Sequence, residues 1–326
     1  MRALVRDVYG SPEVLRLDDV ADPLPREGHA VVRVVASSIN DWDYLLLLGS
    51  PWVNRVSGPR RPRQRVLGSD VAGVVESVGP AVDNVRVGDR VLADASASGF
   101  GAFAELVSLP GASLVAVPDD VPLAVAGVLP QAGGLAQSGL DWRGGVRPGD
   151  RVLVNGAGGG VGTLAVQLAR AAGARVTGAD RADKLEAVRR CGADSAIDIA
   201  GGDLSTRGEV YDRVLDVAMH RSWRAARRLL DRGGCYGVIG GDLRRVIPLF
   251  ALGPLPSLVG DRALGVPHWN ASDRDQLASL CRLVQEGVLV PVVDSTVALD
   301  GVPDAFRRFG ASRHVGKIAV RIADEG

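Results

Sequence analysis

A glycine-rich segment at residues 155–162 has the residue types and the spacing that bind a pyrophosphate. It reads Asn155-Gly-Ala-Gly-Gly-Gly-Val-Gly162 and follows the β-branched run Arg151-Val-Leu-Val154. Glycines let the backbone turn tightly and approach the phosphates, whose charge is stabilised by the N-terminus of the following helix. The alternative is a tight strand-to-helix turn that binds nothing. The candidate cofactor-binding residues of the segment are Ala157, Gly158, Gly159, Gly160, Val161 and Gly162.

A cluster of charged residues follows about 20 residues later, at the distance expected for a residue that contacts the adenosine ribose. The sequence Gly178-Ala-Asp-Arg-Ala-Asp-Lys184 places Asp180 at the end of a second β-branched run. A carboxylate there accepts hydrogen bonds from both ribose hydroxyls of NAD(H) and repels the 2′-phosphate of NADP(H). Arg181 and Lys184 either face that phosphate or are solvated residues that open a helix. The sequence therefore predicts NADP(H) or NAD(H) as cofactor, with Asp180, Arg181 and Lys184 as candidate binding residues.

The elements that must position these residues follow two patterns. Up to about residue 118, short β-branched runs such as 30–36, 71–78 and 89–93 alternate with turn residues, which predicts an antiparallel β-rich domain. From Val121 onward strands and helices alternate, which predicts a parallel sheet covered on both faces. We expect strands at 151–154, 175–179, 196–199, 213–217, 236–239, 290–296 and 317–322, and helices at 161–172, 184–191, 223–230 and 273–286.

The composition limits the partners and the location of the chain. Its 326 residues are 46% hydrophobic and 23% charged, with 38 acidic and 38 basic side chains, so no net field attracts nucleic acid or a lipid surface. Cys191, Cys235 and Cys281 are odd in number and widely spaced, which argues against a disulfide framework. The N-terminus lacks an apolar signal segment and no run approaches the length of a membrane span. We therefore expect a cytoplasmic protein with a small-molecule substrate, with no nucleic acid and no membrane partner.

Several further motifs occur in a familiar order. They are Gly10-Ser-Pro-Glu-Val-Leu15, Ala36-Ser-Ser-Ile-Asn40, Leu67-Gly-Ser-Asp-Val-Ala-Gly-Val74, Val87-Gly-Asp-Arg-Val91, Gly101-Ala-Phe-Ala-Glu105 and Gly316-Lys-Ile-Ala-Val320. With the glycine-rich segment between them, the chain resembles the medium-chain dehydrogenase/reductase superfamily, in its zinc-independent quinone oxidoreductase branch.

The resemblance implies an α/β protein of two domains. A GroES-like β-rich catalytic domain would comprise residues 1–120 and 290–326, and a Rossmann dinucleotide-binding domain residues 121–289, with the cofactor in the cleft between them. Gly240 and Lys317 join the candidate cofactor-binding residues. Related enzymes commonly pair their Rossmann sheets edge to edge, so the resemblance also implies a homodimer.

The positions that hold catalytic zinc in other members of the superfamily lack metal ligands here. Those members use a Cys after the first core strands and a His that follows a Gly, whereas this chain has Ser37-Ser-Ile-Asn-Asp41 and Gly68-Ser-Asp70. The four histidines and three cysteines are scattered without the spacing of a tetrahedral site. We expect no metal. Without a Lewis acid, a conjugated acceptor such as a quinone or an α,β-unsaturated carbonyl is the favoured substrate.

Asn40 and Tyr44 are the candidate catalytic residues, because the segment after Ser-x-Asn lines the nicotinamide cleft in the family. Asn40 could hydrogen-bond the substrate carbonyl or the cofactor amide, and Tyr44 could donate a proton or orient a water. The alternative is structural, with Asn40 or Asp41 capping a helix that begins there. The proton could equally come from solvent.

Two departures from the family pattern concern the cofactor. Leu135 stands where relatives have a Thr, and Ala218 stands where they have a glycine. The apolar, proline-interrupted segment at residues 248–256 is either a wall of the substrate pocket or a dimer contact.

These observations leave three hypotheses. The first is an NAD(P)H-dependent oxidoreductase that transfers hydride to a quinone or an α,β-unsaturated carbonyl. The second is a tailoring enoyl reductase or a recruited cyclase in secondary metabolism, and the third is a non-catalytic dinucleotide-binding protein.

Overall fold

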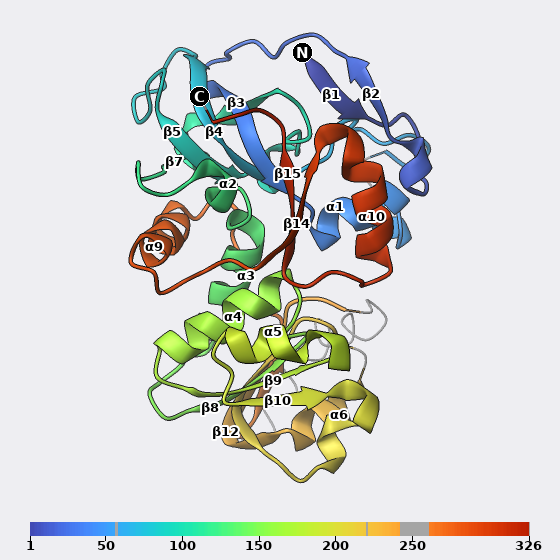
Figure 1. The fold of residues 1–326 in the computed structure, drawn as a ribbon, viewed down its shortest axis with the longest axis vertical. Coiled ribbons are helices and arrows are strands. Elements are labelled where there is room, and N and C mark those ends of the chain that lie inside the picture. Colours follow the sequence, from blue (N-terminus) through green and yellow to red (C-terminus); the bar gives the residue numbers. More distant parts are fainter. Residues whose placement is uncertain (56–57, 220, 242–260, 326) are drawn as a thin grey trace. The chain divides into compact units, whose positions relative to one another are not determined.

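A computed structural model describes the chain except for residues 56–57, 220, 242–260 and 326. The chain forms two compact units, which we treat separately (Figure 1). The antiparallel unit comprises Met1–Gly134, Asn270–Gly287 and Val293–Gly326, and the parallel unit comprises Leu135–Trp269 and Val288–Val292.

The antiparallel unit is built on a sheet in which strands run in the order β14-β15-β3-β4-β5-β7, with β6 paired to β3 and a separate β1–β2 hairpin. All neighbouring strands are antiparallel except β14 and β15. The strands are β1 (Arg2–Val5), β2 (Arg16–Asp19), β3 (His29–Ser38), β4 (Asp70–Val78), β5 (Arg90–Asp94), β6 (Leu106–Pro110), β7 (Val115–Ala116), β14 (Val293–Ala298) and β15 (Lys317–Arg321). The helices are α1 (Asp41–Leu48), α2 (Leu123–Ala126), α9 (Arg274–Gln285) and α10 (Val302–Gly310).

Two hydrophobic clusters hold this unit together. One contains Val32, Val71 and Leu109 between the central strands. The other packs Leu47 of α1 and Phe306 of α10 with Phe103. The second cluster fixes the start of α1 and the end of β3, where Asn40 and its neighbours lie.

The parallel unit is a six-stranded sheet in the order β10-β9-β8-β11-β12-β13, with every neighbouring pair parallel. Counted from β8, this is the strand order 3-2-1-4-5-6 of a dinucleotide-binding Rossmann fold. The strands are β8 (Arg151–Asn155), β9 (Arg175–Asp180), β10 (Ser195–Asp198), β11 (Tyr211–Asp216), β12 (Leu230–Val238) and β13 (Ala263–Gly265). The helices are α4 (Gly160–Ala171), α5 (Leu185–Arg190) and α6 (Trp223–Arg228), and α3 (Pro130–Asp141) passes from the antiparallel unit into this one.

Helices α4 and α5 lie side by side against strands β8 to β10 (Figure 1). The inner residues of β8 are fully buried, as expected of a strand covered on both faces. Helix α4 buries Leu164, Ala165 and Val166, because its apolar residues recur with the helical period. This packing fixes the N-terminus of α4 at the carboxyl end of β8.

The predicted α/β fold and its elements are confirmed, with shifts of at most three residues at most element ends. Strand β12 is the exception, because it begins at Leu230, six residues before its predicted start. The compact units differ from the predicted domain boundaries at residues 121–134 and 270–287, which group with the antiparallel unit, and at residues 290–292, which group with the parallel unit. Close packing explains the first difference, because Gly127 lies against Ala36, and Gly133 lies against Leu280 of α9. The boundaries as evolutionary domains stay a prediction. The segment at residues 248–256 lies outside the described residues.

Candidate functional site

The glycine-rich loop connects β8 to α4, as the sequence predicts. Gly156 turns the chain with a φ of +83°. Gly159 is the N-cap of α4. Because glycine has no side chain to cap the helix, the first backbone N–H groups of this 12-residue helix have no partner within it. Such a terminus stabilises an anion through its free N–H groups and the helix dipole.

The glycines of the loop have different physical roles. A Cβ on Gly162 would overlap the Gly156 carbonyl oxygen and approach the Ala157 Cα to 2.6 Å, so this glycine is needed for packing of the helix on its own loop. A Cβ on Gly159 would meet only the Gly156 oxygen, at 3.5 Å, which is ordinary contact. The space beside Gly159 is therefore open, as a bound pyrophosphate requires. The neighbouring residues Gly160 and Val161 form the first turn of α4.

Asp180 holds the loop to the end of β9. Its Oδ2 accepts a hydrogen bond of 2.8 Å from the Gly158 N–H, and its Oδ1 accepts one of 2.8 Å from the Arg181 N–H. The side chain is buried, and a carboxylate has lone pairs to spare when each oxygen accepts once. Asp180 can therefore accept further hydrogen bonds from a ribose beside Gly158.

Arg181 and Lys184 differ in their partners. The Arg181 guanidinium donates to both oxygens of Asp183, from Nε at 3.1 Å and from Nη2 at 2.6 Å. This pair raises the pKa of Arg181 and lowers the pKa of Asp183. The aliphatic part of the Lys184 side chain packs on Gly158. A Cβ added to Gly158 would lie only 2.6 Å from the Lys184 Cβ. Lys184 is 5% exposed, and no ion pair joins it to any described residue.

A buried polar group at the carboxyl end of β11 completes this edge of the parallel sheet. Asn155 donates a hydrogen bond of 2.6 Å to Asp216, which also accepts from Arg221 at 3.1 Å and from the Tyr236 hydroxyl. Sequence reasoning missed this group. The signal that could have found it is a polar residue at the end of each of two adjacent buried strands.

The candidate cofactor-binding residue Gly240 and the two departures from the family pattern, Ala218 and Leu135, also belong to this unit. The Gly240 carbonyl accepts from the Met219 N–H at 3.2 Å. Ala218 lies against Gly156, because a Cβ added to Gly156 would be 3.4 Å from the Cβ of Ala218. Leu135 lies in α3, half-buried. The structure thus brings Gly240 and Ala218 to the same sheet edge as the glycine-rich loop.

In the antiparallel unit, Asn40 lies in a buried polar cluster. Its Nδ2 donates to Ser69 Oγ at 3.0 Å and to Asp70 Oδ2 at 2.8 Å, and its Oδ1 accepts from the Lys317 ammonium. Lys317 also donates to the Ile39 carbonyl and to Asp70, both at 3.3 Å. The three donors of Lys317 and both donors of Asn40 are therefore used inside the unit. These contacts give both residues a structural role, whereas their predicted catalytic and cofactor-binding roles stay predictions.

Asp43 is a second buried carboxylate of this cluster, which sequence reasoning missed. It accepts from the Gly68 N–H and from Ser69 Oγ, both at 3.0 Å. Burial, followed by the nearby charge of Asp70, raises the pKa of Asp43 to about 7. The same two causes raise the pKa of Asp94, at the end of β5, to about 7. The cluster therefore takes up protons near neutral pH.

Tyr44 packs into the hydrophobic core of the same unit. Its ring stacks on Phe306 at a centroid distance of 6.0 Å and meets Phe309 edge-on at 5.8 Å. The ring contacts belong to the interface of α1 with α10. They favour a packing role for Tyr44 over the predicted proton donor, which stays a prediction.

The residues at the zinc positions of the superfamily do not fit that metal. Ser38 donates to Asp70, Ser69 donates to Asp43, and the Lys317 ammonium lies 3.3 Å from Asp70. Zinc takes thiolate, imidazole or carboxylate ligands, and the Lys317 ammonium beside the Asp70 carboxylate would repel it. Among the described residues, no group of three or more His, Cys, Asp or Glu side chains gathers as metal ligands would.

Comparisons with known proteins match this architecture. Residues 26–119 match the alcohol dehydrogenase GroES-like domain, and residues 191–320 match the zinc-binding dehydrogenase family. The quinone oxidoreductase QR1 of Triphysaria versicolor is 30% identical over 98% of each chain. The chain belongs to the medium-chain dehydrogenase/reductase superfamily. Its relatives there include quinone and enone oxidoreductases, which confirms the predicted family.

Two further comparisons place the chain within the medium-chain dehydrogenase/reductase superfamily. The NADPH-dependent alkenal/one oxidoreductase of Arabidopsis thaliana is 30% identical over 98% of this chain and 79% of its own length. The structure of the quinone oxidoreductase from Coxiella burnetii superposes with a TM-score of 0.89 at 25% identity, over 99% of both chains. The predicted GroES-like and Rossmann architecture is therefore confirmed.

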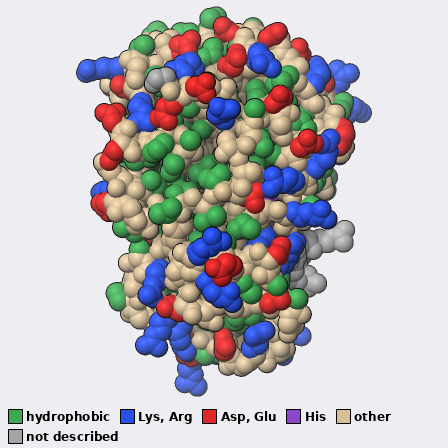
Figure 2. Space-filling view, viewed as in Figure 1, with side chains coloured by type: hydrophobic (Ala, Val, Ile, Leu, Met, Phe, Trp, Pro, Cys, Tyr) green, Lys and Arg blue, Asp and Glu red, His purple; other side chains and the backbone are tan. Residues whose placement is uncertain are grey.

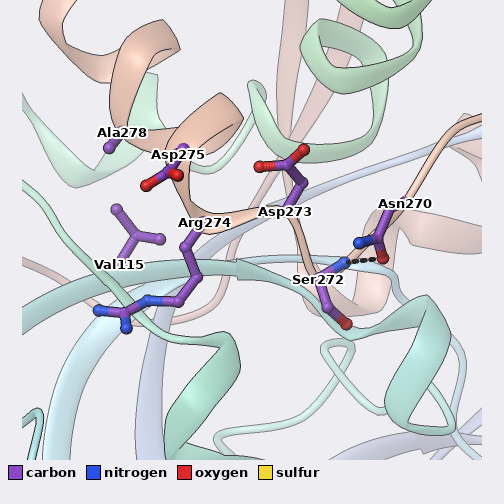
Figure 3. Close-up of a pocket in the computed structure, with 7 residues that line it drawn as sticks. All are labelled: Val115, Asn270, Ser272, Asp273, Arg274, Asp275 and Ala278. Atoms are coloured by element: carbon purple, nitrogen blue, oxygen red, sulfur yellow. Dashed lines mark hydrogen bonds between the residues drawn. The ribbon is translucent and has the colours of Figure 1, made fainter.

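A surface hollow of about 600 Å³ in the antiparallel unit contains none of the candidate residues. It lies at the N-terminus of α9, where Arg274, Asp273 and Asp275 line it and Ser272 donates to Asn270 at 3.0 Å (Figure 3). Asp273 is engaged as the N-cap of α9. We assign no ligand to this hollow.

Two general features of the described residues concern the surface charge and the length of the helices. Figure 2 shows acidic and basic side chains interspersed over one face, without a large field of one sign. None of the described helices is both long and apolar enough to cross a lipid bilayer.

Proposed function

We propose that this chain is an NAD(P)H-dependent reductase that transfers a hydride to a quinone or to an α,β-unsaturated carbonyl compound. The observation that carries the proposal is the loop at the N-terminus of α4. The space beside Gly159 is open, and the N-terminus of α4 that begins there has no side-chain cap. When bound there, a reduced nicotinamide dinucleotide would supply the hydride.

The residues of the parallel unit would divide the binding between them. The loop amides and the N-terminus of α4 would hold the pyrophosphate. Asp180 would accept the ribose hydroxyls, and the Lys184 ammonium would supply positive charge beside Gly158. Either NADH or NADPH is compatible with this arrangement.

The names of the relatives support the acceptor class. An alkenal/one oxidoreductase and quinone oxidoreductases match nearly the whole chain. Hydride would add to the conjugated carbon, and a proton from solvent would add at the other end of the conjugated system. This assignment needs no Lewis acid, in agreement with Ser38 and Ser69 at the zinc positions. The tailoring enzyme stays the second candidate, because the polyketide synthase GfsB of Streptomyces halstedii is 32% identical over 91% of this chain, which spans 5% of that protein's length. No specific observation favours the non-catalytic protein.

Loss of nicotinamide absorbance with a panel of quinones, enones and enoyl thioesters tests the proposal. Wild type is expected to turn over with a simple quinone or enone. Gly159→Val is expected to lose cofactor binding while keeping its circular dichroism, because the side chain would fill the space of the pyrophosphate. Ala171→Val, at the exposed opposite end of α4, is the matched control.

The outcomes separate the hypotheses. Turnover with enoyl thioesters alone would favour the tailoring reductase, and tight binding without turnover would favour the non-catalytic protein. Wild-type binding of NADH and NADPH by Gly159→Val would overturn the loop assignment.

We further propose that the protein forms a homodimer joined through the edge strand β13, which light scattering would test. We also propose a cytoplasmic location, which cell fractionation would test.

A further inference from the structure

The ion pair between Arg181 and Asp183 lies where the two nicotinamide dinucleotides differ. Arg181 follows Asp180, the last residue of β9, and Asp183 belongs to the 3-10 helix at Ala182–Lys184 that leads into α5. In a Rossmann fold the end of this strand faces the adenosine ribose, which carries a 2′-hydroxyl in NADH and a 2′-phosphate in NADPH. Our inference concerns the choice between them, and it rests on the proposed function.

The geometry of the pair engages one edge of the Arg181 guanidinium. That edge, formed by Nε and Nη2, faces the two oxygens of Asp183, at 3.1 and 2.6 Å. A bidentate pair of this kind uses the same planar fork that would bind a phosphate. Both side chains are about half exposed, at 44% and 55%, so the pair lies in contact with solvent.

Two carboxylates and two cations lie at the end of β9, where the 2′ position would be. Asp180 presents a carboxylate there, fixed by the amides of Gly158 and Arg181. Lys184 packs along Gly158, and no ion pair joins it to a described residue. With Arg181 paired to Asp183, a phosphate carrying nearly two negative charges would meet these two carboxylates and one unpaired lysine.

We propose that Asp183 is a specificity-determining residue, which lowers the affinity for NADPH by holding the Arg181 guanidinium away from the 2′-phosphate. Asp180 discriminates by direct repulsion, whereas Asp183 acts through Arg181. The two effects are therefore separable by a double-mutant cycle.

The test measures dissociation constants of NADPH and NADH by fluorescence titration for wild type, Asp183→Ala, Arg181→Ala and the double variant. Asp183→Ala is expected to tighten NADPH about two- to fivefold, the range for an exposed ion pair, with NADH changed less than about twofold. The gain should disappear in the Arg181→Ala background and shrink at high salt. Glu186→Ala is the matched control, since it removes the same charge from an exposed side chain three residues away that pairs with Arg189 and Arg190 instead.

Three results would overturn the inference. These are an unchanged NADPH affinity in Asp183→Ala, an equal gain in Glu186→Ala, and a gain that persists when Arg181 is absent. The last two would mean that a lost negative charge, and not a released guanidinium, attracts the phosphate. Failure of wild type to bind either dinucleotide is a different result, because it would overturn the proposed function itself.

Discussion

At the scale of single residues, the buried cluster around Asn40 has hydroxyl, amide and ammonium groups where zinc-dependent members of the superfamily have thiolate and imidazole ligands. Lys317 supplies a positive charge between Asn40 and Asp70, and the backbone N–H of Gln131 donates to the other oxygen of Asp70 at 2.8 Å. A buried carboxylate without such partners is costly. The cluster therefore joins the end of β3, the start of β4 and the start of β15.

The first prediction contrasts the two lysines of the chain. Lys317→Met is expected to lower the free energy of unfolding by about 3 kcal/mol, because the Asp70 carboxylate loses its buried cation. Lys184→Met should change that free energy little and weaken cofactor binding instead. Urea denaturation and cofactor titration of both variants check this. A stable Lys317→Met variant with weak cofactor binding would restore Lys317 to the cofactor site.

The second prediction concerns the pH dependence of stability. The folded-state pKa of Asp43 is about 7, whereas a carboxyl in the unfolded chain titrates near pH 4. Between these values the folded protein binds a proton that the unfolded chain has released, so the contribution of Asp43 to stability falls as the pH rises through this window. It levels off above pH 7. The expected slope is about 1 kcal/mol per pH unit.

Unfolding of wild type and Asp43→Asn between pH 4.5 and 8 measures this contribution as the difference between the two curves. The difference should decline with rising pH, because the amide does not titrate. The exposed Asp83→Asn variant is the charge-matched control. A difference that stays flat across the window would contradict the raised pKa.

At the scale of elements, the β8–loop–α4 unit combines folding and ligand binding in neighbouring glycines. Gly162 allows the helix to pack closely on its own loop, and the missing side chain of Gly159 leaves space open in front of the helix. The two are three residues apart and look alike in the sequence. Only the distances around each Cβ position distinguish them.

The third prediction follows from this difference. Gly162→Ala is expected to lower the free energy of unfolding by about 1–3 kcal/mol, because its methyl group would collide with backbone atoms of Gly156 and Ala157. Gly159→Ala should stay within about 0.5 kcal/mol of wild type, since its φ of −86° suits any residue. Chemical denaturation of the two variants checks this, and equal losses would show that both glycines are structural.

At the scale of the whole molecule, the antiparallel unit is made of three separate stretches of chain. β15, near the C-terminus, pairs with β3 and contributes Lys317 to the Asn40 cluster. The Glu325 carboxylate accepts from the Leu123 N–H at 3.0 Å and pairs with Arg90. Both ends of the chain therefore stabilise one unit, while the parallel unit has a core of its own.

The sequence by itself determined the features that depend on neighbouring residues. Alternating strands and helices predicted the Rossmann sheet, and the spacing of Ala157, Gly159 and Gly162 predicted its loop, because a tight turn and a helix N-terminus are built from consecutive residues. The bounds of β8, α4 and β9 are accordingly within a residue or two of the prediction.

Only the tertiary structure decided which side chains already have hydrogen-bond or ion-pair partners within the protein. Lys317 meets Asp70 across 247 positions, and Asn40 meets it across 30, once β15, β3 and β4 pack together. Even two positions apart, Arg181 pairs with Asp183 because the turn after β9 points their side chains at each other. A sequence lists donors and acceptors, but packing fixes the distances and directions on which every hydrogen bond and ion pair depends.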